Sequence, residues 1–424
     1  MMGINTLPQL AMYWNKNPFI GNAGIQSVMT KNRFEQLCQY LHFSDTTKEP
    51  KRGEPNYDRL FKILPVLKDV LDKAKNTYEP SKNISVDEGM IAFKGRLAFR
   101  QYMPAKPTKC GIKVWLAADS SNEYVSNFSI FMGKESDAPR THGLGYDVVM
   151  AMVEPFLNEH RHVFSDSFFT SPKLFDNLLK ENMYACGTVR TNRKEMPASA
   201  SMKEKLKPEE KVVTQRGQLV YTKWHDKKDV SFLSTNVSPG EPSRLVPRLV
   251  KGQDITIEKP RVADVYPKHT GGVDRADQLR SFYHTGWQSR KWYRYIFWFL
   301  FNLSVCNAHV LESFYNDNHN KRRRPLIDFK IELGTLLING FSQRKRRSVE
   351  PVNAELPVDQ HVSVHVQGRK RKCVQYMKAG IRTAKGYKVE TRFECSLCKV
   401  ALCLATCHGE FHAAPLLVND VNIR

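Results

Sequence analysis

Four aspartates of this 424-residue sequence stand where carboxylates could bind divalent cations. Asp87 lies inside a β-like stretch, ISVDEGMIAF, and Asp166 ends the strand-like stretch HVFSD. Asp274 opens a helical stretch after two glycines, and Asp277 follows one turn later on the same helix face. Hard divalent ions such as Mg²⁺ prefer oxygen ligands, and a pair of them activates water or a 3′-hydroxyl for phosphodiester cleavage and strand transfer. The sequence therefore predicts a metal-dependent site, provided that the fold brings these acids together.

Each aspartate also fits a structural role when it is considered alone. An aspartate at a strand end commonly forms a turn, and one near a helix start commonly caps the helix or interacts with its dipole. Carboxylates gathered from a central strand, a neighbouring strand and a helix are, however, the arrangement expected of a ribonuclease H-like core. Strand periodicity separates Asp87 from Glu88, which should point to the opposite face and serve a structural role.

A second set of candidate ligands lies near the end of the sequence. The stretch CSLCKVALCLATCHGEFH holds four cysteines and two histidines within 18 residues. Closely spaced cysteine pairs with a nearby histidine are typical of tetrahedral Zn²⁺ sites in ribbon- or RING-like modules. Free thiols in a frayed tail are the alternative. The candidate ligands are Cys395, Cys398, Cys403, Cys407 and either His408 or His412.

The elements that must position these residues indicate an α/β protein with a mixed sheet. Helices are expected over 8–45 and 57–76, followed by three β-like runs between 84 and 133 and then by alternating helices and strands. A lysine-rich polar stretch with short strands reads as an insertion. The predicted boundaries are a helical dimerisation or DNA-binding region at 1–80, a core in two parts at 81–190 and 263–320 around an insertion domain at 191–262, a basic linker at 321–368 and a cysteine-rich domain at 369–424.

Charge favours a polyanionic partner, with nucleic acid the first candidate. The chain carries 65 Lys and Arg against 43 Asp and Glu, a net charge of +22. No signal peptide is recognisable, and the most apolar stretch, 293–311, is interrupted by polar residues, so an intracellular protein without a membrane span is expected. The basic run GRKRK at 368–372 could contact phosphates or act as a nuclear localisation signal, and a solvated charged linker is the alternative.

Aromatic and basic residues alternate after the third acid. Trp292 follows Arg290 and Lys291 in the stretch YHTGWQSRKWYRYIFWF. Aromatic rings can stack on exposed bases while cations hold phosphates. Because a helix as apolar as this one mostly packs into a core, burial of Trp292 is the alternative.

Several stretches resemble the piggyBac family of DNA transposases and their domesticated descendants. They are ISVDEGMIAFKGR, YMPAKPTKCGIKVW, SDSFFTS, YACGTVRTNRK and GGVDRADQLRSFY, and the resemblance covers nearly the whole chain. It implies a catalytic set at Asp87, Asp166 and Asp274 with a further acid at Asp277, and Mg²⁺ or Mn²⁺ as cofactor. It also implies cleavage at terminal inverted repeats, insertion at TTAA, a homodimer and a nuclear location. Lys94 and Arg96 would then neutralise incoming phosphates.

The resemblance also shows where this chain departs from the pattern. Cys373 is present upstream of the cysteine cluster, but Tyr376 stands where the family leads one to expect a second cysteine, so a single Zn²⁺ is expected, with His412 as the favoured histidine. The chain begins close to LPQLAMYW, without the long N-terminal part common in the family. A domesticated, catalytically inactive DNA-binding or chromatin protein is therefore the alternative function, and a zinc module that binds histone tails or other protein partners is a third.

Overall fold

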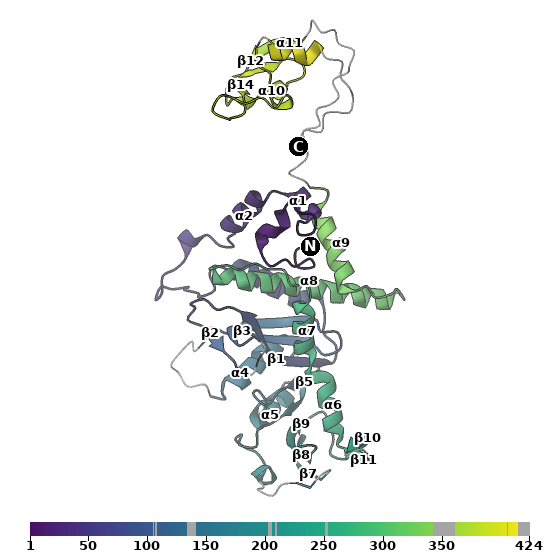
Figure 1. Cartoon of the computed structure of the whole chain (residues 1–424). Helices are drawn as coiled ribbons and strands as arrows, with labels where there is room; N and C mark the ends of the chain where they lie inside the picture. Colours follow the sequence, from purple (N-terminus) through teal and green to yellow (C-terminus); the bar gives the residue numbers. More distant parts are fainter. Residues whose placement is uncertain are drawn as a thin grey trace. The chain divides into compact units, whose positions relative to one another are not determined.

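A computed structural model describes residues 1–104, 106, 108–133, 141–201, 206–207, 210–250, 253–341, 361–404 and 406–413 (Figure 1). The chain divides into two compact units, Met1–Gln343 and Arg344–Arg424. Much of the predicted basic linker, from 342 to 360, lies outside the described residues.

The first unit is built on a nine-stranded mixed sheet with the order β2-β3-β1-β5-β6-β9-β8-β7, in which β4 also pairs with β3. Strands β1, β5 and β6 are parallel to one another, and the other pairings are antiparallel. The predicted α/β class with a mixed sheet is confirmed. The strands are β1 (Asn83–Ala92), β2 (Arg100–Tyr102), β3 (Cys110–Asp119), β4 (Val125–Ile130), β5 (His162–Ser165), β6 (Tyr184–Thr188), β7 (Lys211–Arg216), β8 (Leu219–His225) and β9 (Asp229–Ser234).

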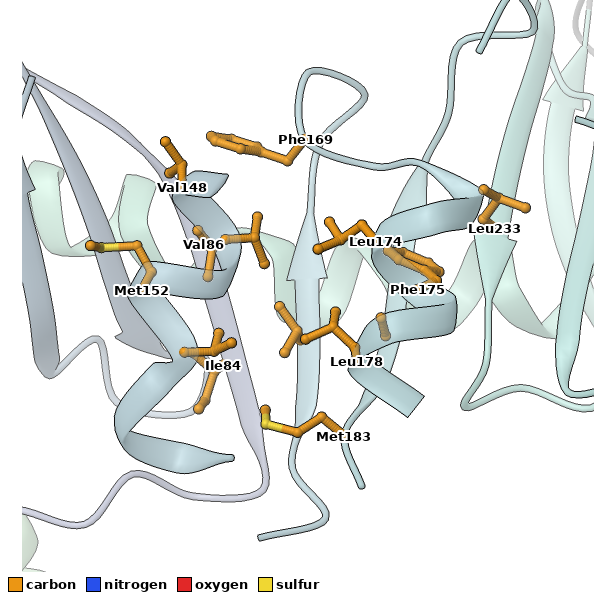
Figure 2. Close-up of a cluster of buried hydrophobic side chains, with 14 of the residues drawn as sticks. Ile84, Val86, Val148, Met152, Phe169, Leu174, Phe175, Leu178, Met183 and Leu233 are labelled. Atoms are coloured by element: carbon orange, nitrogen blue, oxygen red, sulfur yellow. The ribbon is translucent and has the colours of Figure 1, made fainter. Parts of the chain in front are cut away.

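One face of the sheet is covered by α4 (Leu144–Val153) and α5 (Pro172–Lys180). Figure 2 shows this cluster, in which Ile84 and Val86 of β1 meet side chains of both helices. The apolar residues of α5 fall on one side of the helix, and Ser171 caps its start by accepting a hydrogen bond from the Leu174 amide.

The other face is covered by α3 (Leu64–Thr77), α6 (Arg261–Thr270), α7 (Gly272–Ser281) and α8 (Trp292–Asn318). Ile91 of β1 points to this face, so the strand alternates between two buried environments. Although α8 has 27 residues, no described helix combines the length and apolar character that crossing a membrane requires. The helix α9 (Leu326–Ile338) follows α8 and contacts it.

The predicted insertion, 191–262, contributes directly to this sheet. Strands β7, β8 and β9 extend it beyond β6, whereas the hairpin of β10 (Arg244–Val250) and β11 (Gln253–Lys259) forms a separate two-stranded sheet. Helix α6 was not predicted, and it contains Pro267.

The N-terminal helices are shorter than the sequence analysis predicts. In place of one helix over 8–45, the chain forms η1 (Leu10–Trp14), α1 (Ala23–Val28) and α2 (Lys31–Tyr40), and η2 (Thr46–Lys48) follows. Asn22 and Thr30 break the pattern because their side chains cap new helix starts. The second helix, α3, begins at Leu64 rather than at 57, with Pro65 in its first turn.

The second unit consists of short elements. They are β12 (Ser363–His365), β13 (Arg371–Lys372), α10 (Val374–Lys378), β14 (Glu390–Thr391), β15 (Phe393–Cys395) and α11 (Thr406–Ala413). Strand β12 pairs with β15, and β13 pairs with β14.

Candidate active site and metal-binding groups

Asp87 and Asp166 lie side by side on neighbouring parallel strands. Val86 of β1 is in register with Ser165 of β5, so the next residue of each strand is an aspartate at the same level. Asp87 Oδ1 accepts a hydrogen bond of 2.7 Å from the Glu88 amide, and Asp166 Oδ1 accepts one of 2.8 Å from the Phe168 amide. The parallel pairing of β1 with β5 therefore brings these two carboxylates together.

Helix α7 supplies the other two acids because glycines let it approach β1 closely. A Cβ at Gly272 would lie 3.0 Å from the Ser85 side chain, and a Cβ at Gly89 would lie 3.2 Å from Asp277 Oδ2. Ser85 and Gly89 flank Asp87 on the same face of β1, so Asp277 lies over the strand two residues from Asp87. Asp277 also accepts a hydrogen bond of 2.9 Å from Arg280.

Asp274 lies one turn before Asp277 on α7, and its side chain is exposed to solvent. Among the described residues, the groups of three or more potential ligands whose atoms lie within 4.8 Å of one another do not include these aspartates. Asp87, Asp166, Asp274 and Asp277 therefore do not form one such compact ligand group.

The electrostatic setting disfavours charge on the buried acids. Burial, followed by the charge of Glu88, raises the pKa of Asp87 to about 7, and burial raises the pKa of Asp166 as well. Lys106 opposes both shifts. Burial would lower the pKa of Lys106 itself, but the charges of Asp87 and Glu88 raise it. Asp87 and Asp166 therefore ionise less readily than ordinary aspartates.

Glu88 points away from Asp87, as the strand period predicts. Its carboxylate pairs with Lys106 Nζ at 3.3 Å and with Lys113 Nζ at 3.8 Å. Lys113 lies 4.0 Å from the ring centre of Trp115, on the face that packs against α4 and α5. The charge of Glu88 nevertheless raises the pKa of both neighbouring aspartates.

The predicted nucleic-acid contacts differ in accessibility. Lys94 and Arg96 are exposed just beyond the end of β1, and Arg290 is exposed before α8. Lys291 Nζ lies 3.2 Å from His42 Nε2. Trp292 is half-buried, and its ring packs edge-on against Phe99 at 5.6 Å between centroids. Much of this side chain therefore packs into the core.

The second unit gathers its histidines and cysteines into two groups instead of the predicted single set. The first comprises His361, Cys395, Cys398 and His412, with ligand atoms within 4.8 Å of one another. His361 Nδ1 lies 3.3 Å from Cys395 Sγ and 3.2 Å from Cys398 Sγ. His361 was not predicted because it precedes Cys395 by 34 residues and no local spacing links the two.

This first group fits a tetrahedral zinc ion. Two cysteines and two histidines are a standard donor set for zinc, and the Cys398 amide donates to Cys395 Sγ at 3.4 Å, as in a metal-binding knuckle. His412 Nε2 is buried without a hydrogen-bond partner among the described residues. His408, the alternative ligand, lies beside His412 at 4.7 Å between ring centroids and is not part of the group.

Cys403 and Cys407, predicted as ligands of the same ion, lie elsewhere. They form the second group together with Cys373. The two groups are interleaved along the sequence. His361 of the first group comes before Cys373, Cys395 and Cys398 of the first group lie between Cys373 and Cys403, and His412 of the first group comes after Cys407.

Comparisons with known proteins agree with this architecture. A family model described as "Transposase IS4" matches residues 1–309. The chain is 26% identical over 423 residues to human (Homo sapiens) PiggyBac transposable element-derived protein 3, covering 97% of this chain and 68% of that protein. It is 27% identical over 319 residues to human (Homo sapiens) PiggyBac transposable element-derived protein 2, covering 73% of this chain and 52% of that protein.

A solved structure has the same fold. It is a cryo-EM structure of a piggyBac transposase synaptic complex with hairpin DNA, and it aligns with a TM-score of 0.68 and 23% identity over 89% of this chain and 78% of that chain. The chain therefore belongs to the piggyBac family of transposases and transposase-derived proteins.

Proposed function

We propose that this protein binds DNA and catalyses metal-dependent strand cleavage and transfer at terminal inverted repeats, with a preference for TTAA targets. The observation that carries the proposal is the pair of Asp87 and Asp166 at one level of two parallel strands, with the acids of α7 packed over β1. Family membership and the hairpin DNA bound by the structural neighbour support it.

The four aspartates would hold Mg²⁺ or Mn²⁺. When bound, such ions activate an attacking water or 3′-hydroxyl and stabilise the leaving oxygen. Asp87 must lose its proton to act as a ligand, and burial makes it the acid most dependent on an incoming cation. To bind a cation, Asp277 must either keep its hydrogen bond with Arg280 at the same time or lose that hydrogen bond.

DNA would be held by the basic surface. Lys94, Arg96 and Arg290 are exposed and could contact phosphates, as the net charge of +22 favours. Zinc in the group of His361, Cys395, Cys398 and His412 would fold the C-terminal unit, and the run 368–372 would direct the protein to the nucleus. A homodimer is the expected assembly.

The second candidate is a domesticated protein that binds DNA or chromatin proteins without cutting DNA. The observation that favours it is the ion pair between Asp277 and Arg280, which occupies a carboxylate that a metal ion would need. The curated relatives are themselves named transposable element-derived proteins.

An excision assay on a plasmid that carries matching inverted repeats separates the two candidates. Strand cleavage requires Mg²⁺ or Mn²⁺ and is lost in Asp166→Asn, whereas Asp69→Asn, which changes an exposed acid of α3, serves as the matched control. Excision that is absent from the wild type while repeat binding persists would support the domesticated protein. DNA binding that does not weaken with salt would contradict both candidates.

A further inference from the structure

A large apolar cavity in the first unit has no place in the proposed function. It measures about 790 Å³ and lies where η1, α1 and α2 meet α8 and α9 (Figure 1). Its walls are mostly aromatic and aliphatic side chains, among them Trp14, Phe34, Trp298 and Phe301. The four candidate acids are not among the described residues that line it. Cavities of this size, apolar with a few polar groups, are typical sites for small ligands.

The cavity has an apolar rim that is exposed to solvent. Leu37 of α2 is 46% exposed, and Ile331 and Leu337 of α9 are 40% and 70% exposed. Large aliphatic side chains on these helices therefore keep apolar surface in contact with water, which is unfavourable until an apolar group covers it. This rim favours an occupant with an apolar body.

Lys330 of α9 is the one charged side chain among the described residues that line the cavity, and it is only 8% exposed. Its Nζ donates hydrogen bonds of 3.2 Å to the carbonyl oxygens of Phe282 and Tyr283, which carry no net charge. Among the described residues, no carboxylate forms an ion pair with it, and burial lowers its pKa. Because buried charges are usually paired, this ammonium group is suited to an anion that enters the cavity.

From this juxtaposition we infer that the cavity binds a fatty acid, whose hydrocarbon chain fills the apolar space and whose carboxylate pairs with Lys330. An ammonium group has three donors, and two of them are used by the carbonyl oxygens, so one remains for the ligand. One cation with one free donor matches the single charge of a carboxylate better than the nearly two charges of a phosphate monoester. The inference goes beyond the proposed function and does not depend on strand cleavage.

Ligand titration of the full-length protein tests the inference. Decanoate, added below its critical micelle concentration, should bind with one equivalent per chain by isothermal titration calorimetry. The uncharged 1-decanol should bind at least about tenfold more weakly, because it lacks the charge-assisted hydrogen bond with Lys330. Affinity should rise roughly fourfold for each added methylene from hexanoate to decanoate, because each buried methylene removes a similar apolar area from water.

Substitutions separate the charge of the cavity from its shape. Lys330→Met keeps an unbranched side chain and should abolish the preference for decanoate over 1-decanol while 1-decanol still binds, a result that an unfolded cavity would not give. Lys73→Met, at a lysine of α3 whose side chain is 70% exposed, is the matched control and should keep the preference. Gly334→Leu enlarges the wall at α9, where a Cβ would lie 3.6 Å from the Met1 side chain, and should weaken binding of both ligands.

Cys38 gives a readout inside the cavity itself. It is half-buried and lines the cavity, so a bound hydrocarbon chain should shield its thiol from a maleimide reagent. Peptide mass spectrometry should show that decanoate slows the labelling of Cys38 several-fold. Labelling of Cys110 should not change, because this residue is also half-buried but is not among the described residues that line the cavity.

Four results would overturn the inference: no binding of decanoate, equal affinity for decanoate and 1-decanol, an unchanged preference in Lys330→Met, or labelling of Cys38 that decanoate does not slow. Binding of an amphipathic peptide with one glutamate, in place of decanoate, would instead assign the cavity to a protein partner and would also overturn it. If Lys330→Met does not fold, the comparison with 1-decanol and the labelling of Cys38 decide the matter. Each of these outcomes leaves the metal-dependent cleavage assay unaffected, so the inference and the proposed function can fail separately.

Discussion

The two units of this protein position their candidate ligands in opposite ways. In the first unit the acids stand on a sheet whose faces are covered by extensive apolar clusters. In the second unit, the buried residues include three of the five cysteines, and apolar side chains such as Ile381 and Leu404 are exposed. The acid site is therefore held by packing that is independent of metal, whereas the cysteine groups must themselves supply the structure around them.

The largest expected effect is the response of each unit to chelation. Removal of zinc should unfold the C-terminal unit, because binding energies of structural zinc, on the order of 10 kcal/mol, are folding energy in small modules. Hydrogen exchange measured by mass spectrometry should show loss of protection within 361–413 and unchanged protection in β1, β3 and β5. Loss of protection in the sheet as well would show that the first unit also depends on the metal.

Asp119 tests whether packing and hydrogen bonds alone hold the first unit. This buried carboxylate at the end of β3 accepts hydrogen bonds from the Tyr78 hydroxyl and from the amides and hydroxyls of Ser81 and Ser121. Burial would raise its pKa, but these donors lower it. Asp119→Asn should lower the free energy of unfolding of the first unit by about 3 kcal/mol, measured by urea denaturation.

The control for this change is Asp69→Asn on α3, which should have almost no effect because Asp69 is exposed. Zinc release from the second unit should not change in either variant. A depressed carboxyl pKa stabilises the fold above the ordinary pKa of about 4, so the wild type should lose this contribution as pH falls below that value.

Asp87→Asn should separate cation binding from folding at the acid site. A buried carboxylate next to Glu88 opposes folding, so without added metal the variant should be at least as stable as the wild type, with a gain of about 1 kcal/mol or less. Mg²⁺ should raise the melting temperature of the wild type and not that of the variant. Glu88→Gln should instead destabilise the protein, because Lys106 and Lys113 lose their partner. A wild type that does not respond to Mg²⁺ or Mn²⁺ would contradict a cation site at these acids.

A comparably small effect concerns His162 at the start of β5. Burial, then the charges of Lys82 and His269, lowers its pKa to about 4, and its Nδ1 lies 3.2 Å from the side-chain nitrogen of Asn236. The unfolded chain takes up a proton near pH 6.5 and the folded chain only near 4, so stability should fall as pH decreases through this window. Because the ring is half-buried and screened by solvent, the loss should be roughly 1 kcal/mol. His162→Gln should flatten this part of the stability profile, and an equal slope in the variant would assign the pH dependence to other groups.

The sequence predicts the central strands of the fold well, because β1, β3, β4 and β5 are short runs rich in apolar, strand-forming residues, although polar residues such as Asp87 and Lys113 lie within them. It predicts α4 and α5 for similar reasons. The prediction of the N-terminal helices is wrong because local capping by Asn22 and Thr30 interrupts an otherwise helical pattern. Helix α6 was missed because it adjoins the polar insertion and contains a proline.

The two candidate sites also differ in how far the sequence predicts them. The places of the acids in a strand, at a strand end and at a helix start made them candidates, but the resemblance to the piggyBac family singled them out as a set. The close approach of α7 to Gly89 explains how Asp277 reaches β1. The partition of the cysteines could not be predicted from spacing, since Cys403 follows Cys398 closely and Cys407 precedes His412 closely in the sequence. Only the fold joins them to Cys373 and joins His361 to Cys395.

The interleaving of the two ligand groups along the chain has a consequence for the entropy of ordering each group. Closing the loop from His361 to His412 also shortens the free chain that must be ordered between Cys373 and Cys407. Loop-closure entropy grows only slowly, by about 0.6 kcal/mol for each doubling of loop length, so zinc at the first group would lower the entropic cost of gathering the second group by only a small amount. The interleaving would therefore couple the two groups weakly through chain entropy alone, and this coupling requires no contact between them.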